Sequence, residues 1–98
     1  MTLPTGAPPL AALKQWLAIS TGGEDALLQR LLTVAFETCS AFVGAAVLPD
    51  DWAAVPPSLN EGILRFAAHL YRAREEGTAS EPPAAVAALW RPYRELRL

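Results

Sequence analysis

The chain contains 98 residues, of which 52% are hydrophobic and 18% are charged, and its formal net charge at pH 7 is −2. This length accommodates one domain, because a second hydrophobic core would lack residues to build it. The slightly acidic balance argues against a protein that reads DNA or RNA through a basic surface. So large an apolar fraction in a small protein predicts that part of its surface is covered by a partner, and association between copies is the simplest way to cover it.

The amino-terminal segment, MTLPTGAPPL, has neither the basic residues nor the apolar run of a secretory signal. The sequence also lacks a stretch of about eighteen apolar residues without a charge. We therefore expect no membrane contact, and expect the protein to be made and kept in the cytoplasm unless lysis releases it. Residues 1–8 are rich in Pro, Gly and Thr and are predicted to form a flexible N-terminal arm.

A short first helix is predicted from Pro8 and Pro9 onward. Leucines and Trp16 recur there at helical spacing until residues 20–23, STGG, interrupt the pattern. About ten residues do not form a stable helix in water, so this one must dock on the rest of the chain.

A long second helix is predicted to open at residues 23–25, with two carboxylates in its first turn, and to run to about Val43 or Ala46. Its polar residues fall within a stripe about 80° wide, and apolar side chains fill the rest of the circumference. Neighbours within so small a chain cannot cover all of that circumference, so we expect part of this helix to meet another subunit. The polar stripe comprises Arg30, Thr33, Glu37, Ser40 and Gly44.

The single cysteine, Cys39, lies within the apolar pattern of this helix. It cannot form an internal disulfide, and we expect it to be a small buried hydrophobe rather than a reactive thiol.

The segment after the second helix, residues 47–55, is predicted to be a loop or short turn anchored by Trp52. Its adjacent carboxylates, Asp50 and Asp51, have no further ligands at a metal-binding spacing, so a solvated turn is favoured over a metal site.

The third helix, within residues 56–77, has the clearest signals. It is predicted to begin at Pro57, or at Leu59 if Ser58 and Glu61 form a capping box, and to end near Gly77. One face is apolar and the opposite face is polar, which predicts that one side lies in the core and the other in solvent. The apolar face comprises Leu59, Ile63, Phe66, Ala67, Leu70 and Tyr71, and the polar face Glu61, Arg65, His69, Arg72 and Glu76.

A fourth, short helix is predicted over residues 84–90, with Pro92 disturbing or ending it. The tail, residues 91–98, contains three arginines, a tyrosine and two leucines. This composition suits contact with another protein, although a frayed basic end has the same composition.

No strand pattern or internal repeat is found in the sequence. The predicted fold is therefore all-α, a small bundle in which two longer antiparallel helices are accompanied by short N- and C-terminal helices.

The sequence gives no indication of an enzyme, because no nucleophile with a base and no paired carboxylates at a suitable spacing are recognisable. His69 is the only histidine and is expected at a surface or an interface. No phosphate-binding glycine loop, zinc spacing or dinucleotide fingerprint occurs. We expect no catalytic residue, cofactor or metal.

In order and spacing, the helical segments resemble the gp6-like head–tail connector family of tailed phages and phage-derived gene transfer agents. The most specific pieces are AAHLYRARE, residues 67–75, and LWRPYRELRL, residues 89–98. The resemblance implies an all-α adaptor, residues 1–98, at the neck of the virion. It implies a twelve-fold ring under the portal that extends the DNA channel, passes DNA without specificity and links the portal to the stopper or tail.

The resemblance also suggests which residues make these contacts. The tail, residues 91–98, becomes a docking tail for the portal, and the polar faces of the two long helices become candidates for contact between subunits. The portal-docking candidates are Trp90, Tyr93, Arg94, Leu96, Arg97 and Leu98, and the subunit-interface candidates are Arg30, Phe36, Glu37, Arg65, His69 and Arg72.

Two other functions are compatible with four short helices. One is a small helical protein-binding module or regulator that acts as a monomer or dimer. The other is a helix-turn-helix DNA-binding protein, against which stand the acidic balance and the lack of a basic recognition helix.

Overall fold

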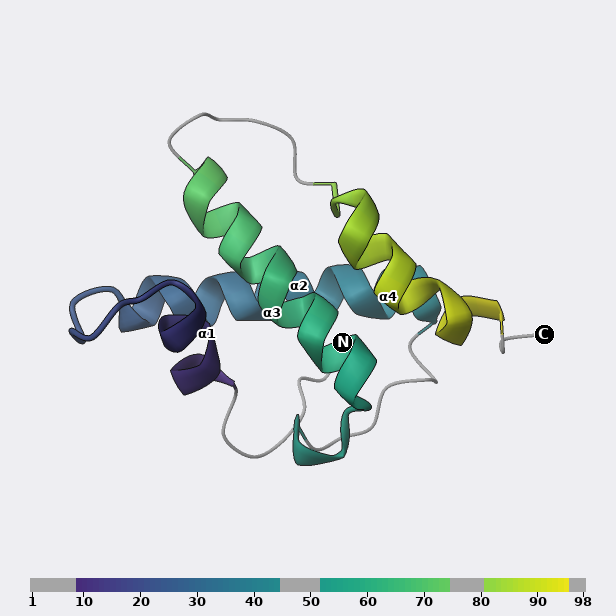
Figure 1. Cartoon of the computed structure of the whole chain (residues 1–98), viewed down its shortest axis with the longest axis horizontal. Helices are drawn as coiled ribbons and strands as arrows, with labels where there is room; N and C mark the ends of the chain where they lie inside the picture. The colour runs from purple at the N-terminus through teal and green to yellow at the C-terminus, as the bar shows by residue number, and fades with distance from the viewer. Residues whose placement is uncertain (1–8, 45–51, 75–80, 96–98) are drawn as a thin grey trace.

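The computed structural model describes residues 9–44, 52–74 and 81–95. These residues form four α-helices and one short 3-10 helix, which confirms the predicted all-α fold (Figure 1). The elements in chain order are α1 (Leu10–Trp16), α2 (Asp25–Val43), the 3-10 helix η2 (Trp52–Ala54), α3 (Pro57–Ala73) and α4 (Ala84–Glu95). The N-terminal arm, the first part of the loop after α2 and the last three tail residues lie outside the described residues.

The two long helices, α2 and α3, run in broadly opposite directions and cross obliquely (Figure 1). Each of them contacts all three other helices, so together they form the centre of the bundle. α4 packs against both of them near the C-terminal end of α2, and α1 packs near the other end (Figure 1). The two short helices therefore depend on the two long ones for a surface, as expected for helices of this length.

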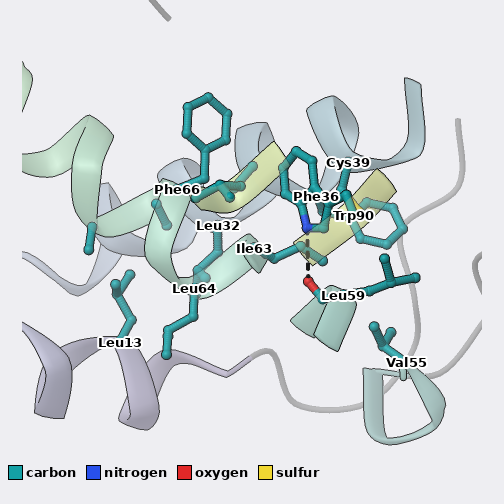
Figure 2. Close-up of a cluster of buried hydrophobic side chains, with 14 of the residues drawn as sticks. Leu13, Leu32, Phe36, Cys39, Val55, Leu59, Ile63, Leu64, Phe66 and Trp90 are labelled. Atoms are coloured by element: carbon teal, nitrogen blue, oxygen red, sulfur yellow. Dashed lines mark hydrogen bonds between the residues drawn. The ribbon is translucent and has the colours of Figure 1, made fainter. Parts of the chain in front are cut away.

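The core lies where α2 and α3 cross (Figure 2). Leu59, Ile63, Phe66 and Ala67 of α3 are completely buried, which confirms most of the predicted apolar face. The remaining two members of that face, Leu70 and Tyr71, are partly buried at its edge. From α1 and the facing surface of α2 the core contains Leu13, Leu28, Leu32, Ala35, Phe36, Cys39 and Val43. Trp52 and Val55, before α3, and Val86 and Trp90 of α4 extend it.

The α2 helix is long and apolar enough to cross a membrane by length and composition alone, with a mean hydropathy of 1.3. Its buried side chains pack against the other helices of this chain, so we interpret it as the core helix of the bundle.

The predicted polar stripe of α2 is correct for Arg30 and Glu37, which are exposed, but wrong for Ser40, which is 3% exposed. The hydroxyl of Ser40 is not among the buried side-chain groups that lack a hydrogen-bond partner in the described part of the chain, so its burial leaves no unpaired polar group there.

The start of α3 follows one of the two predicted alternatives. The helix begins at Pro57, with Pro56 as its N-cap, and no side chain caps it. The capping box is therefore wrong: Ser58 lies within the first turn, and Glu61 forms an ion pair with Arg65, with Oε2 2.8 Å from Nε. Proline at the first helical position has no N–H that needs a cap. The helix ends at Ala73, and Gly77 lies outside the described residues.

α4 is longer than predicted, because it continues through Pro92 to Glu95. A proline inside a helix leaves the carbonyl four residues earlier without its donor. Here that residue is Ala88, and both Ala88 and Pro92 are exposed. Solvent can therefore reach the freed carbonyl, which explains why the helix tolerates Pro92 where a buried position would not.

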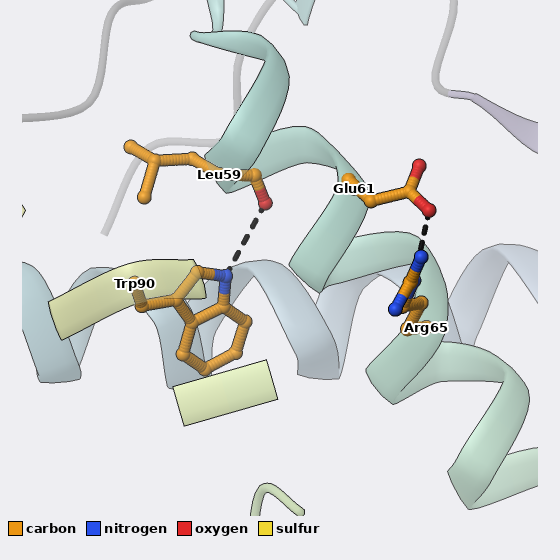
Figure 3. A network of polar contacts seen from close by, with 4 residues as sticks. All are labelled: Leu59, Glu61, Arg65 and Trp90. Carbon is orange, nitrogen blue, oxygen red and sulfur yellow. Dashed lines mark hydrogen bonds and ion pairs between the residues drawn. The ribbon is translucent and has the colours of Figure 1, made fainter. Parts of the chain in front are cut away.

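α4 approaches α3 closely through Trp90, whose ring lies against Gly62 and near Leu59 (Figure 3). Trp90 is completely buried there, and its Nε1 donates a hydrogen bond to the carbonyl oxygen of Leu59 at 3.3 Å. The indole ring also packs edge-on against Phe66 at 6.1 Å and lies 5.8 Å from the ring of Phe42. A large aromatic ring with its N–H satisfied contributes strongly to a core, so Trp90 attaches α4 to both long helices.

We predict that Gly62→Ala destabilises the protein. A methyl group at Gly62 would lie 2.8 and 2.9 Å from Cδ1 and Cε2 of Trp90, and closer still to Nε1. In an open helix this substitution stabilises by about 0.5–1 kcal/mol, whereas overpacking a core costs about 1–3 kcal/mol. Because the indole is buried and cannot move aside, we expect the free energy of unfolding to fall by about 1–2 kcal/mol, measured by urea denaturation.

Gly23→Ala is the matched control, because a methyl group at Gly23 meets no atom within 4 Å. Its free energy of unfolding should stay within about 0.5 kcal/mol of the wild-type value. An unchanged or raised midpoint for Gly62→Ala would mean that α4 is not held against α3 as described.

Candidate functional site

Of the six predicted subunit-interface residues, four are exposed, one is partly buried and one is buried. Arg30 and Glu37 are exposed on α2, while on α3 Arg65 and Arg72 are exposed and His69 is partly buried. Phe36 is only 3% exposed and packs edge-on against Trp52 at 5.2 Å. This is a correction to the predicted set: Phe36 belongs to the core, because η2 returns over that side of α2 and covers it.

The outer face of α2 is defined by exposed residues at helical spacing. They are Ala26, Gln29, Arg30, Val34, Glu37 and Ala41. Val34 is 37% exposed and lies between a cationic and an anionic side chain. Half of these residues are apolar, and the face carries one charge of each sign, which is consistent with the prediction that part of α2 remains uncovered within one chain.

The second exposed surface lies where the outer side of α3 meets α1. Trp16 of α1 is 44% exposed, and the guanidinium carbon of Arg65 lies 5.3 Å from the centre of its ring. The same guanidinium pairs with Glu61 (Figure 3). Arg65 therefore joins an aromatic ring and a carboxylate at one place on the surface, through a cation–π contact and an ion pair.

Sequence reasoning missed Trp16 as a surface residue. It recurs with the leucines of the first helix, and the apolar pattern placed all of them on one docking face. In this helix of seven residues only Leu13 is completely buried, while Leu10 and Leu17, the residue that follows the helix, are partly buried. The shortness of this helix could have indicated that Trp16 is exposed. So few residues cannot bury a large indole in the last turn in addition to the leucines.

The portal-docking candidates are also divided by the structure. Trp90 is 0% exposed, so its side chain offers no surface to a partner in this fold, and it is removed from the docking set. Tyr93 is partly buried against the core and Arg94 is exposed. The remaining candidates, Leu96, Arg97 and Leu98, lie outside the described residues.

Arg94 lies at a surface pocket between α2 and α4. The pocket has a volume of about 340 Å³ and is lined by Thr38, Ala41, Phe42, Pro82 and Arg94. The guanidinium of Arg94 lies 5.1 Å from the centre of the Phe42 ring. An apolar floor with a cation at its rim suits an apolar side chain next to a carboxylate or carbonyl group. This pocket depends on α4 continuing past Trp90, so the sequence prediction of an earlier helix end could not reveal it.

A third polar cluster joins α1, α2 and α3. The hydroxyl of Tyr71 donates a hydrogen bond to Oε1 of Glu24 at 2.6 Å, and Arg74 lies 3.6 Å from the other oxygen of that carboxylate. The hydrogen bond to the Glu24 carboxylate raises the pKa of Tyr71, as does the negative charge of that group. Lys14 and Asp25 form a neighbouring ion pair at 2.8 Å. These contacts hold the end of α3 to the start of α2 and have the character of a structural clamp.

Among the described residues, the two with the most reactive side chains are His69 and Cys39, and each lies in an apolar setting. His69 stacks on Phe66 at 6.3 Å with the rings 19° apart. Cys39 is completely buried, and burial raises the pKa of its thiol from 9.0 to about 12. Among the described residues, no group of three or more His, Cys, Asp or Glu side chains lies together as a metal site requires.

The fold and these surfaces define a small helical protein whose exposed features suit contacts with other proteins. The model of the phage gp6-like head-tail connector protein family matches residues 9–88, which is most of the chain. The chain therefore belongs to this family of structural virion proteins, which places it at the head–tail junction, in contact with other virion proteins. The match ends before residues 89–98. Neither a search of curated proteins nor a search of solved structures gave a significant match.

We predict that Cys39 is inert in the folded chain. With a pKa of about 12, only about one thiol in ten thousand is ionised at pH 8, and none of it is exposed. A thiol-specific disulfide reagent should therefore label the native chain at least about 100-fold more slowly than the chain in denaturant. Ala41→Cys adds an exposed thiol on the same helix as a control and should label quickly; equal rates for Cys39 in native and denatured chains would contradict its burial.

The raised pKa also predicts a pH dependence of stability. Well below pH 9 the thiol is protonated in both states, so it does not change the free energy of unfolding. Between pH 9 and about 12 the thiol ionises in the unfolded chain but not in the folded one, so stability is lost as the pH rises. Cys39→Ser should remove this component from the alkaline limb of the stability curve.

Proposed function

We propose that this protein is a head–tail adaptor that forms a twelve-fold ring under the portal of a tailed phage or of a gene transfer agent derived from one. The ring extends the DNA channel and offers a platform to the stopper, head-completion or tail protein. Membership of the gp6-like connector family is the observation that carries the proposal. Before assembly the subunit resides in the host cytoplasm.

The architecture supports this role because it combines a well-packed core with apolar groups left on two outer surfaces. The core ties all four helices together, so the subunit can act as a rigid block. Val34 and Trp16 remain exposed on different helices, as expected of a protein that is covered by neighbours in an assembly. A ring requires such surfaces and needs no catalytic chemistry, cofactor or metal, so we propose a purely structural role.

The charge of the chain is consistent with passive passage of DNA. A net charge of −2 gives no overall attraction for phosphates, so DNA can move through the channel without being held. Contacts with DNA in this proposal are therefore non-specific, and no membrane is involved.

We further propose that the portal contacts the C-terminal end of α4 and the tail. Arg94 and the pocket beside Phe42 form the part of this surface that the structure describes. Tyr93 sits next to it, partly buried, and can support the position of the arginine. The tail residues Leu96, Arg97 and Leu98 extend the same surface in this proposal.

Native mass spectrometry of the chain, alone and with the cognate portal, tests the proposed function. The expected result is a complex of twelve chains with one portal ring, whether or not rings form without the portal. The alternative, a small helical binding module or regulator, predicts a monomer or dimer that ignores the portal, and that result would overturn the adaptor proposal.

We predict that Arg94→Ala, alone and together with Tyr93→Ala, weakens binding to the portal while the fold is retained. Arg94 is exposed, so its loss leaves the core intact, whereas it removes the cation at the rim of the pocket. The expected loss of portal affinity is at least about tenfold for the single variant and larger for the double variant, measured by co-sedimentation with the portal.

Arg91→Ala is the matched control, because Arg91 is also exposed on α4 but does not line the pocket. It removes the same charge and should bind like the wild type. Thermal midpoints show whether Tyr93→Ala has also loosened α4. Unchanged co-sedimentation of both Arg94 variants would mean that the portal does not use this surface.

A further inference from the structure

Two large hydrophobic side chains are exposed in the part of the chain that the structure describes, Trp16 at 44% and Val34 at 37%. Each lies beside one cationic and one anionic side chain. We call Arg30, Val34 and Glu37 the α2 patch, and Trp16, Glu61 and Arg65 the Trp16 patch. The two patches therefore have the same composition: one apolar group with a charge of each sign beside it.

The two patches face away from each other. At 100° per residue, Val34 points about 160° from the buried Leu32 of α2, and Arg65 points about 160° from the buried Ile63 of α3. Leu32 and Ile63 both lie in the core, where α3 crosses α2 (Figures 1 and 2). The α2 patch is therefore on the side of the molecule away from α3, and the Trp16 patch includes the side of α3 away from α2.

The charges of the two patches are complementary. Arg30 and Glu37 lie two turns apart on α2, about 10 Å along the axis, and Glu61 and Arg65 lie about 6 Å apart on α3. Long arginine and glutamate side chains can bridge that difference. If Val34 rests on the Trp16 ring, Arg30 can pair with Glu61 and Glu37 with Arg65.

The Trp16 patch is also held in place before any partner arrives. The guanidinium of Arg65 lies over the Trp16 ring at 5.3 Å and binds Glu61 at 2.8 Å. Side chains already fixed by such contacts lose less conformational entropy on association. Tryptophan and arginine are moreover the residue types that most often dominate the energetics of an interface.

We propose that the occupant of the Trp16 patch is the α2 patch of a second copy of this chain. Val34 of one copy covers Trp16 of the next, Arg30 pairs with Glu61, and Glu37 pairs with Arg65. Because the two patches are different and face away from each other, every copy can bind one neighbour on each side. Such head-to-tail contacts close into rings when the rotation permits. This inference rests on the proposed ring and specifies how its subunits meet.

A symmetric contact between two α2 patches is the competing arrangement. Two antiparallel α2 helices could pair Arg30 of each copy with Glu37 of the other, which would give a closed dimer. That contact leaves Trp16 exposed in both copies. The head-to-tail contact covers both exposed hydrophobic side chains in one interface, so the observed exposures favour it.

Charge reversal tests the pairing. Arg30→Glu and Glu61→Arg are surface changes that should each reduce ring assembly on the portal at least tenfold, measured by native mass spectrometry and co-sedimentation. The double variant, Arg30→Glu with Glu61→Arg, restores the pair with reversed polarity and should recover most of the assembly. Thermal midpoints of all three are expected to stay close to that of the wild type, because none of these residues is buried.

A second double variant separates the two arrangements. Arg30→Glu with Glu37→Arg keeps a symmetric α2 contact complementary, but it opposes like charges across the head-to-tail contact. We expect this variant to assemble no better than Arg30→Glu alone. Val34→Cys is expected to give no disulfide-linked dimer within the ring, because the symmetric contact alone would bring the two thiols together. Recovery of assembly by the Arg30→Glu, Glu37→Arg variant would overturn the proposal, and so would a disulfide-linked dimer of the Val34→Cys variant.

Failure of the inference can be told apart from failure of the proposed function. If the wild-type chain does not assemble on the portal, the adaptor proposal itself is wrong. If the wild type forms rings and both single reversals form them equally well, the ring stands and the pairing of the two patches is wrong.

Discussion

The contact between Trp90 and Gly62 is the constraint on which the rest of the bundle depends. α4 has 12 residues and contains a proline, so it could not stay helical by its own propensity. The buried indole, with its N–H bonded to the Leu59 carbonyl, holds α4 to α3 and reaches Phe42 of α2. Only a residue without a side chain allows the ring to come this close. One glycine therefore determines how closely α4 packs on α3.

The position of α4 has consequences for the surface. Because the helix is held at Trp90 and continues through Pro92, Arg94 comes to lie over the Phe42 ring and a pocket forms beside it. At the other end of the bundle, the clamp between Tyr71 and Glu24 and the ion pair between Lys14 and Asp25 hold α1, α2 and α3 together. The subunit is thus tied at both ends. These contacts hold the outer side of α2 and the Trp16 patch in fixed positions, where neighbours in the proposed ring can bind them.

The sequence predicted the helices and the apolar face of α3 because both depend on periodicity, which is local. It could not identify which helix covers which side chain. Trp90 and Phe36 were predicted at interfaces although the structure buries them, and Trp16 was grouped with the leucines of a docking helix although it is exposed. Each of these errors concerns packing between helices distant in sequence. Gly62 gives no signal in the sequence, since the absence of a side chain becomes informative only when the residue packed against it is known.

The family explains why such a small domain leaves apolar side chains uncovered, because a connector subunit works among other virion proteins. In the proposed ring, each subunit is a rigid body that meets its neighbours through two unlike faces on opposite sides. The most direct test is electron cryomicroscopy of the portal with this chain bound. We expect twelve copies with the four-helix body unchanged, in which α2 of each copy lies against α1 and α3 of the next. One or two copies per portal, or a ring whose α2 outer faces remain in solvent, would contradict the proposed ring.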